Sequence, residues 1–320
     1  MGISGVLLDQ QTLGDDISLT PLMTLFSQWK SYTHTEPQEI VEHSKDRQVI
    51  ITNKVVIDEL VMVQLPQLKL IAVAATGTNN IDLEAAQRLG IRVVNVEGYA
   101  GAAVAQHCFN LLLQLAGRSQ EYHQFMQQGG WPQSQQFCHL GYTMTELAGK
   151  TLGIVGFGNL GKAVAKVAKA FDMHVLISDH PGVEFIREGR VSFEQLLSHS
   201  DVVSLHCPQT AHNELMINRE TLALMKPSAF LINTARGGLV NEQDLVDALT
   251  EQVIAGAALD VLSTEPPTID NPLLNYQGGN LVITPHIAWA TKAARIRLVE
   301  ILSDNIAQEL STLKPSQTKD

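Results

Sequence analysis

The sequence has few cysteines, and they lie far apart. Cys108, Cys138 and Cys207 are its 3 cysteines, and none belongs to a CxxC pair or a Cys/His cluster. This pattern excludes a disulfide framework and gives no support to a zinc site. We expect three buried thiols in a protein of the reducing cytoplasm, with no bound metal.

Basic residues are also scarce, and long apolar runs are missing. Lys and Arg number 22 against 33 Asp and Glu, so the formal net charge is −11, which does not attract nucleic acids or anionic membranes. The longest apolar run, residues 108–117, is interrupted by Asn110 and Gln114, and no basic segment followed by an apolar core opens the chain. We therefore expect no nucleic-acid partner, no membrane span and no signal peptide.

Hydrophobic residues, in contrast, make up 45% of the 320 residues, which is enough for a large core and predicts about two domains. Between residues 5 and 96, short β-type runs alternate with helical stretches, and this alternation predicts a parallel sheet covered on both faces. The runs lie at residues 6–8, 49–51, 70–73 and 93–94.

A second alternating series follows a long helical segment. Residues 102–128 place apolar side chains at helical spacing, and we expect one helix there that connects the two domains. Six β-type runs come next, as a dinucleotide-binding domain requires, at residues 152–155, 174–177, 202–205, 230–232, 255–259 and 281–283. A last helical stretch, residues 291–313, is expected to return to the first domain.

The first strand of the second series leads into a glycine-rich turn, Gly156-Phe157-Gly158-Asn159-Leu160-Gly161. The first glycine permits a tight turn, the second lets backbone approach a pyrophosphate, and the third lets helix and strand pack closely. The N-terminus of the following helix attracts phosphates. The motif therefore predicts that these residues bind a dinucleotide.

Asp179 follows the next strand, 18 positions beyond Gly161, near the spacing of about 20 that this motif requires. Its carboxylate would accept hydrogen bonds from the adenosine ribose and repel a 2′-phosphate, so we expect NAD rather than NADP. The alternative is a turn residue before His180-Pro181-Gly182, and His180 would weaken the selectivity against NADP.

Three chemically capable residues follow later strands, on the side where parallel sheets bind ligands. Arg236 lies between small residues, where its planar guanidinium can clamp a carboxylate. Glu265 precedes two prolines, and His286 follows the last strand. A histidine beside a glutamate is held in one tautomer and can donate a proton to a carbonyl. The sequence has no GxSxG motif and no metal-ligand spacing, so hydride transfer is the remaining chemistry. Taken alone, Arg236 is also consistent with a solvated surface arginine, and Glu265 with a loop carboxylate.

Together these motifs resemble the D-isomer-specific 2-hydroxyacid dehydrogenases along nearly the whole chain. The resemblance rests on the glycine motif, on residues 233–238, and on Asp260, Glu265 and Pro285-His286. It is strongest for members called glycerate dehydrogenase or hydroxypyruvate reductase, through residues 284–291, 95–99 and 103–107. It implies an α/β fold of two doubly wound parallel-sheet domains: a flavodoxin-like substrate domain, residues 1–98 plus 289–320, and a Rossmann NAD-binding domain, residues 99–288.

The same resemblance implies roles for individual residues. His286 would be the proton donor, Glu265 its partner, and Arg236 the substrate clamp. Backbone amides of Thr76 and Gly77 would hold the substrate carboxylate in a cleft between the domains. Cofactor contacts around the nicotinamide would come from Val104, Cys207, Pro208, Thr234, Ala235 and Asp260, and Ala288 would be a further cofactor contact.

The implied activity is the reduction of hydroxypyruvate to D-glycerate with NADH, by a cytoplasmic homodimer with the Ala102 to Gln128 helix and the Trp131 loop at its interface. Three alternatives stay open: another D-2-hydroxyacid or 2-ketogluconate reductase, a phosphoglycerate dehydrogenase, or a non-catalytic dinucleotide-sensing protein related to the corepressors of the family. A phosphoglycerate dehydrogenase would need additional cationic groups, and the acidic composition disfavours the corepressor.

Overall fold

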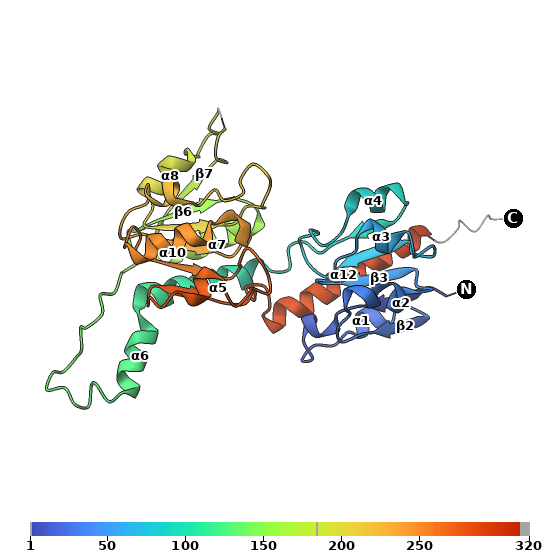
Figure 1. Ribbon diagram of the computed structural model, residues 1–320, viewed down its shortest axis with the longest axis horizontal. Helices are drawn as coiled ribbons and strands as arrows, with labels where there is room; N and C mark the ends of the chain where they lie inside the picture. Colours follow the sequence, from blue (N-terminus) through green and yellow to red (C-terminus); the bar gives the residue numbers. More distant parts are fainter. Residues whose placement is uncertain (1, 184, 314–320) are drawn as a thin grey trace. The chain divides into compact units, whose positions relative to one another are not determined.

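The computed structural model describes residues 2–183 and 185–313, which divide into two compact units (Figure 1). Unit 1 comprises Met1–Ala100 and Ala290–Asp320, and unit 2 comprises Gly101–Trp289. Each unit contains one parallel sheet with helices, so the predicted fold class is confirmed. Within the described residues, no helix is long and apolar enough to cross a membrane.

Unit 1 is built around a five-stranded parallel sheet with the order β2-β1-β3-β4-β5. Its strands are β1 (Ser4–Leu7), β2 (Gln28–Ser31), β3 (Val49–Thr52), β4 (Leu70–Val73) and β5 (Arg92–Val94). Its helices are α1 (Thr20–Met23), α2 (Ile40–Ser44), α3 (Glu59–Met62), α4 (Leu83–Arg88) and α12 (Lys292–Leu313), with 3-10 turns η1 (Gln10–Leu13) and η2 (Pro37–Glu39). Every residue of β1, β3 and β4 is buried, as in a sheet covered on both faces.

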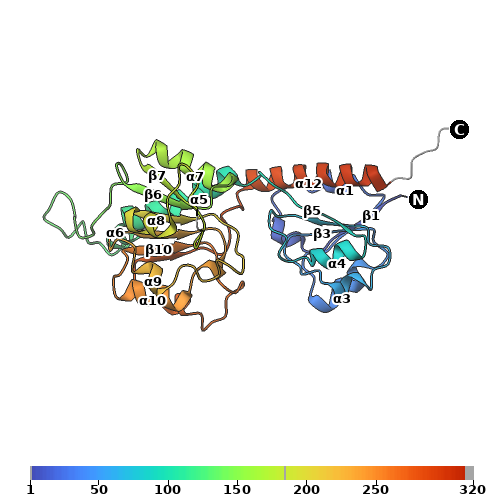
Figure 2. The same cartoon turned by 90° about the horizontal axis from the view of Figure 1, so that it is seen from above.

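Helix α12 comes from the far end of the sequence and packs on α1 and β4. Figure 2 shows it as one unbroken helix. Its side chains Leu298, Leu302 and Ile306 are fully buried, and the hydroxyl of Ser303 donates a hydrogen bond to the carbonyl of Pro21 (2.9 Å). The core of unit 1 therefore depends on residues from both ends of the chain.

Strand β2 is not among the predicted strands. It reads Gln28-Trp29-Lys30-Ser31 and pairs with β1 alone, at the edge of the sheet. Of its residues only Trp29 is partly buried. An edge strand in contact with solvent can carry polar side chains, so it does not need the apolar run by which the other strands are found.

Unit 2 contains a six-stranded parallel sheet with the order β11-β10-β9-β8-β6-β7, and all six predicted strands form. They are β6 (Thr151–Val155), β7 (His174–Ser178), β8 (Val202–Leu205), β9 (Phe230–Asn233), β10 (Gly256–Leu259) and β11 (Leu281–Ile283). The helices are α5 (Gly101–Gly117), α6 (Ser119–Gln127), α7 (Asn159–Ala170), α8 (Phe193–His199), α9 (Arg219–Leu222), α10 (Glu242–Thr250) and α11 (Pro272–Asn275), with the 3-10 turn η3 (Gly237–Leu239).

The segment predicted as one helix over 102–128 is two helices, and this prediction is wrong. Helices α5 and α6 are separated by Arg118, whose φ of 51° places it in the left-handed region. A left-handed residue ends the hydrogen-bonded ladder, so α6 starts in a new direction. Helix α5 packs against α7 and the sheet of unit 2, whereas α6 has no buried residue.

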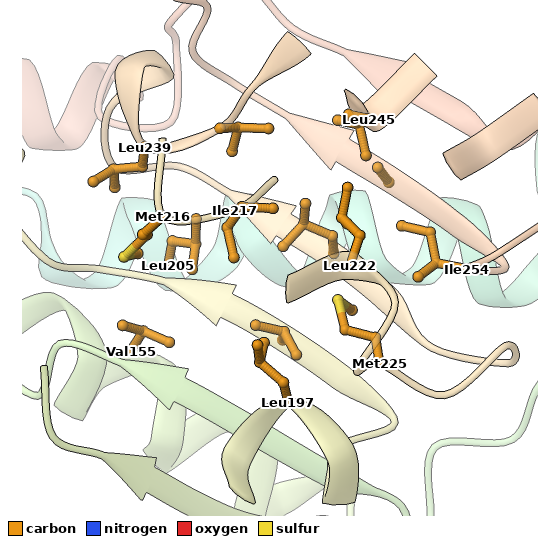
Figure 3. Close-up of a cluster of buried hydrophobic side chains, with 14 of the residues drawn as sticks. Val155, Leu197, Leu205, Met216, Ile217, Leu222, Met225, Leu239, Leu245 and Ile254 are labelled. Carbon is orange, nitrogen blue, oxygen red and sulfur yellow. The ribbon is translucent and has the colours of Figure 1, made fainter. Parts of the chain in front are cut away.

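The hydrophobic core of unit 2 extends to the carboxyl ends of its strands. Val155, Leu205 and Leu239 pack in one cluster with residues of α8, α9 and α10 (Figure 3), and Cys207 and Ala235 belong to the same cluster. Cys108 is also buried, but Cys138 is exposed, so the expectation of three buried thiols is wrong for Cys138. Cys138 lies in the long loop after α6, where few side chains are buried.

Candidate active site

Except for Val104, which lies in α5, the predicted site residues of unit 2 lie at or after the carboxyl ends of the strands. From β6 the chain proceeds to β7 on one side and to β8, β9, β10 and β11 on the other. Ligands of open parallel sheets bind where the strand order reverses in this way, because the loops there diverge. The glycine motif follows β6 and therefore occupies this point.

Two glycines of the motif are required by close approach of the backbone. Gly156 has a φ of +95°, and a Cβ there would lie 2.5 Å from the amide nitrogen of Cys207. A Cβ on Gly161 would collide with the carbonyl oxygen of Gly156. Gly158, in contrast, has no atom within 4 Å of its Cβ position and directly precedes α7, a helix of 12 residues. The motif thus leaves open space at a helix N-terminus, which fits the pyrophosphate of a dinucleotide.

Asp179 follows β7 and is 3% exposed. Its carboxylate accepts hydrogen bonds from the Arg187 backbone amide (2.7 Å) and from Nε of the same residue (2.6 Å), and Nη1 of Arg190 lies 3.3 Å away. The hydrogen bond from the Arg187 side chain is the main reason that the pKa of Asp179 lies below its ordinary value. An anionic carboxylate therefore stands at the predicted ribose position, with two arginines beside it.

His286 and Glu265 are in direct contact. Nδ1 of His286 lies 2.6 Å from Oε2 of Glu265, and Oε1 of Glu265 accepts a hydrogen bond from the Leu262 amide (3.0 Å). The two side chains are 27% and 36% exposed, so both are partly accessible to solvent. Because Nδ1 is engaged by the carboxylate, Nε2 is the nitrogen available for proton transfer.

The backbone of His286 is held on both sides. Its φ of 54° lies in the left-handed region, which a residue with a Cβ rarely adopts. The His286 amide donates to the carbonyls of Asp260 (2.8 Å) and Thr284 (3.0 Å), and the His286 carbonyl accepts from the indole of Trp289 (3.0 Å). These contacts fix the direction in which the imidazole leaves the chain.

The carboxylate of Asp260, 1% exposed, is fully engaged by the same loop. It accepts hydrogen bonds from the amides of Ile287 (2.9 Å) and Ala288 (2.7 Å) and from the hydroxyl of Thr284 (2.5 Å). Burial raises the pKa of Asp260, but hydrogen bonds from His107, Thr284 and the two amides outweigh it and hold the pKa below its ordinary value. His107 is not among the predicted site residues, although its place on the apolar face of α5 is a signal of a buried polar contact.

Arg236 follows β9, the neighbour of β10 in the sheet. The side chain of Asn233 fixes the loop of Arg236. It accepts a hydrogen bond from the amide of Ala235 (3.0 Å) and donates one to the carbonyl of Arg236 (2.8 Å). The small residue Gly237 is needed because the backbone at Leu262 and Ser263 packs against it, too close for any Cβ. The loop with Arg236 is thereby packed against the loop that leads to Glu265.

Comparisons with known proteins agree with this arrangement. The family model described as D-isomer specific 2-hydroxyacid dehydrogenase, NAD binding domain, matches residues 109–288. Glycerate dehydrogenase of Methylorubrum extorquens is 44% identical over 87% of this chain and 88% of its own, and hydroxypyruvate reductase of Blautia hydrogenotrophica is 39% identical over 86% of each. The solved TT0316 protein of Thermus thermophilus has a TM-score of 0.83 and 33% identity, covering 98% of this chain and 99% of that one. The chain belongs to the D-isomer-specific 2-hydroxyacid dehydrogenase family.

This 2-hydroxyacid dehydrogenase is thus an oxidoreductase acting on the CH–OH group of 2-hydroxy acids, and its NAD-binding domain takes a nicotinamide dinucleotide. Most of the positions assigned to the cofactor pocket are buried, namely Val104 of α5 and, after the strands, Cys207, Thr234, Ala235, Asp260 and Ala288. Pro208 is exposed. The Cys108 thiol lies 3.1 Å from the hydroxyl of Thr234, which ties α5 to the end of β9.

Thr76 and Gly77 belong to the other unit of the dehydrogenase, in the loop after β4. The hydroxyl of Thr76 donates to the carbonyl of Val96 (2.8 Å), and the side-chain amide of Asn95 donates to the carbonyl of Thr76 (2.7 Å). The loop is therefore tied to the chain segment after β5. In residues 2–183 and 185–313, no group of three or more His, Cys, Asp and Glu is arranged to hold a metal ion.

Proposed function

We propose that the protein is an NAD-dependent glycerate dehydrogenase that reduces hydroxypyruvate to D-glycerate. The contact between His286 and Glu265, which is 2.6 Å long, carries this proposal. Glu265 follows β10, and Arg236 follows its neighbour β9. It supplies a proton donor with an anionic partner next to a cation that can bind a carboxylate. The 44% identity to the glycerate dehydrogenase of Methylorubrum extorquens supports the choice of substrate.

Each catalytic side chain has a distinct task in this proposal. The guanidinium of Arg236 binds the carboxylate of the 2-oxo acid and reaches its carbonyl oxygen, and the amides of Thr76 and Gly77 bind the carboxylate as well. The imidazole of His286 donates a proton from Nε2 to the carbonyl oxygen, and Glu265 stabilises the charged imidazole until then. A bound reduced nicotinamide supplies the hydride that the carbonyl carbon accepts.

The two directions of the reaction require opposite protonation states of His286. Reduction of the 2-oxo acid needs the imidazolium, whereas oxidation of D-glycerate needs the neutral imidazole as a base. Reduction is therefore faster at lower pH and oxidation at higher pH, within the range in which the protein is folded.

For the cofactor, we propose NADH in preference to NADPH. The glycine motif, from Gly156 to Gly161, would hold the pyrophosphate, and the buried carboxylate of Asp179 would accept the ribose hydroxyls. The residues expected around the nicotinamide are Val104, Cys207, Pro208, Thr234, Ala235 and Asp260, and Ala288 would be a further cofactor contact. Arg187 and Arg190 favour NADPH through their charge, so the preference depends on Asp179 remaining in place.

We further propose that the enzyme is a cytoplasmic homodimer. Helix α6 and the loop after it expose large apolar side chains, with Phe137 94% and Leu140 79% exposed and Trp131, Met126 and Met144 also on the surface. Isolated apolar side chains are common on surfaces, but several on one projecting segment favour a partner surface. Light scattering tests this point, and a monomeric mass would refute it.

Initial rates test the function as a whole. With NADH, hydroxypyruvate is expected to give a higher kcat/KM than glyoxylate, pyruvate, 2-ketogluconate or phosphohydroxypyruvate. The variant H286A is expected to lose about 100-fold or more in kcat. Preference for phosphohydroxypyruvate or 2-ketogluconate would overturn the substrate, and cofactor binding without turnover of any of them would favour the sensor protein.

A further inference from the structure

His107 is a polar residue on the apolar face of α5. It lies three positions after Val104 and four before Leu111, both buried, and its own side chain is 14% exposed. A ring in such a position requires a hydrogen-bond partner, since a buried polar atom without one is costly. Its partners are the two side chains that hold the loop of His286.

The contacts of His107 determine which nitrogen carries the proton. Nε2 lies 2.9 Å from the hydroxyl oxygen of Thr284 and 3.3 Å from Oδ1 of Asp260. The hydroxyl hydrogen of Thr284 is already donated to Oδ1 of Asp260, at 2.5 Å. The Thr284 oxygen and the carboxylate can therefore only accept from the ring, so Nε2 is protonated and donates to both.

Asp260 transmits this contact to the catalytic loop. The Asp260 carboxylate accepts hydrogen bonds from the amides of Ile287 and Ala288, and the Asp260 backbone carbonyl accepts one from the amide of His286. These amides belong to the residue with left-handed φ and its two successors, a conformation that persists only where surrounding contacts hold it. Loss of the hydrogen bonds that hold the Asp260 carboxylate would therefore let the loop of residues 284–288 leave this conformation.

We propose that His107 is a positioning residue for proton transfer: through Thr284 and Asp260 it holds residues 284–288 so that the His286 imidazole keeps its contact with Glu265. The proposal rests on the proposed role of His286 as proton donor. It differs from a packing role, since what matters is the N–H donated by Nε2 and not the volume of the ring.

The first test separates the donor from the volume. H107L removes the N–H, and H107Q retains an amide N–H at a similar distance along the side chain. With hydroxypyruvate and NADH, H107L is expected to lower kcat about 10- to 100-fold. In H107Q, kcat is expected to stay close to that of the unmodified enzyme. T284V, which breaks the same network from the loop side, is expected to behave as H107L does.

A double variant tests whether His107 acts through His286. In an H286A background, H107L is expected to cost no further activity, because the group that it positions is absent. The proposal would be overturned if the losses in kcat of H107L and H286A multiplied in the double variant. It would also be overturned if H107L and H107Q lost kcat equally, or if kcat of H107L stayed within twofold of the unmodified enzyme.

Hydrogen exchange provides a readout that needs no substrate. Loss of the His107 donor is expected to speed exchange of the amides of residues 286–288 in H107L but not in H107Q, with exchange in the rest of α5 unchanged. Unchanged protection of these amides in H107L would overturn the positioning role. If the unmodified enzyme fails to reduce any 2-oxo acid, the proposed function is wrong, and the exchange data still decide whether His107 holds the loop.

Discussion

Nδ1 of His286 lies 2.6 Å from Oε2 of Glu265, and the second oxygen of that carboxylate is fixed by the Leu262 amide at 3.0 Å. A carboxylate anchored in this way can orient the imidazole without itself moving. The pair therefore presents Nε2 of the imidazole in one fixed direction.

Replacing Glu265 by Gln keeps the shape of the side chain and removes its charge. Reduction of hydroxypyruvate is expected to slow by about 10- to 100-fold, because the imidazole loses the anionic partner that orients it. Steady-state measurement of kcat checks this. Glu242→Gln is a matched control, since Glu242 bonds Ser263 and Asn271 in the same region and does not touch His286; equal losses in both variants would contradict the prediction.

Replacing Arg236 by Lys keeps the positive charge but loses the planar pair of donors. KM for hydroxypyruvate is expected to rise about 10- to 100-fold and kcat to fall with it, because the clamp both binds and orients the substrate. Steady-state kinetics measure both constants. Arg219→Lys, in an exposed arginine that pairs with Asp247, should change neither.

Replacing Asp179 by Ser removes the anion and leaves Arg187 and Arg190 without their partner. The ratio of kcat/KM for NADPH to that for NADH is expected to rise about 100-fold, since the freed guanidinium groups attract a 2′-phosphate. Adding Arg187→Gln to this variant should reverse most of the gain. Because Arg187 keeps the pKa of Asp179 low, the preference of the unmodified enzyme for NADH should not change between about pH 6 and 9.

The three thiols differ in reactivity. Burial raises the pKa of Cys207 to about 11 and that of Cys108 to about 12, whereas Cys138 is exposed. In the native protein near pH 8, a disulfide reagent is expected to modify one thiol rapidly and the others slowly or not at all. Cys138→Ser should abolish the rapid phase; a rapid phase that persists in this variant would show that a buried site opens.

Stability at mildly acidic pH depends on His206. Burial lowers the pKa of this residue to about 4 from 6.5, and its Nε2 lies 2.8 Å from the hydroxyl of Ser204. The unfolded chain therefore binds more protons than the native protein between these values, and stability falls as pH falls from about 6.5 to about 4. Urea midpoints at several pH values measure this slope, which His206→Gln should flatten and the exposed control His34→Gln should not.

Most strands could be predicted from the sequence, for a physical reason. Strands buried on both faces need continuous apolar runs, and such runs mark β3, β4 and all six strands of unit 2. Strand β2 escapes this criterion because solvent contact at the edge permits Gln28 and Lys30. The break between α5 and α6 could not be predicted either, because the left-handed residue there is Arg118 and not a glycine or asparagine, which would mark a helix end.

The candidate site shows the same division. Asp179, Arg236 and His286 could be assigned to the site from the sequence because each comes shortly after a predicted strand. Parallel strands bring their carboxyl ends to one edge of the sheet. The network of His107, Asp260 and Thr284 joins residues up to 177 positions apart, and its existence depends on the path of α5 across the sheet. The residues near His107 in the sequence contain no information about that path.

The contribution of α12 to unit 1 has a consequence for how the protein is made. Ribosomes release the chain from its N-terminus, so the strands of unit 1 emerge first, yet the face that contacts Leu298, Leu302 and Ile306 stays uncovered until the last helix has emerged. Unit 2, residues 101–289, has all its segments available earlier and can complete its core first. Residues 1–100 thus complete their core only after residues 101–289 have been synthesised, and until α12 follows they expose an apolar face that can aggregate.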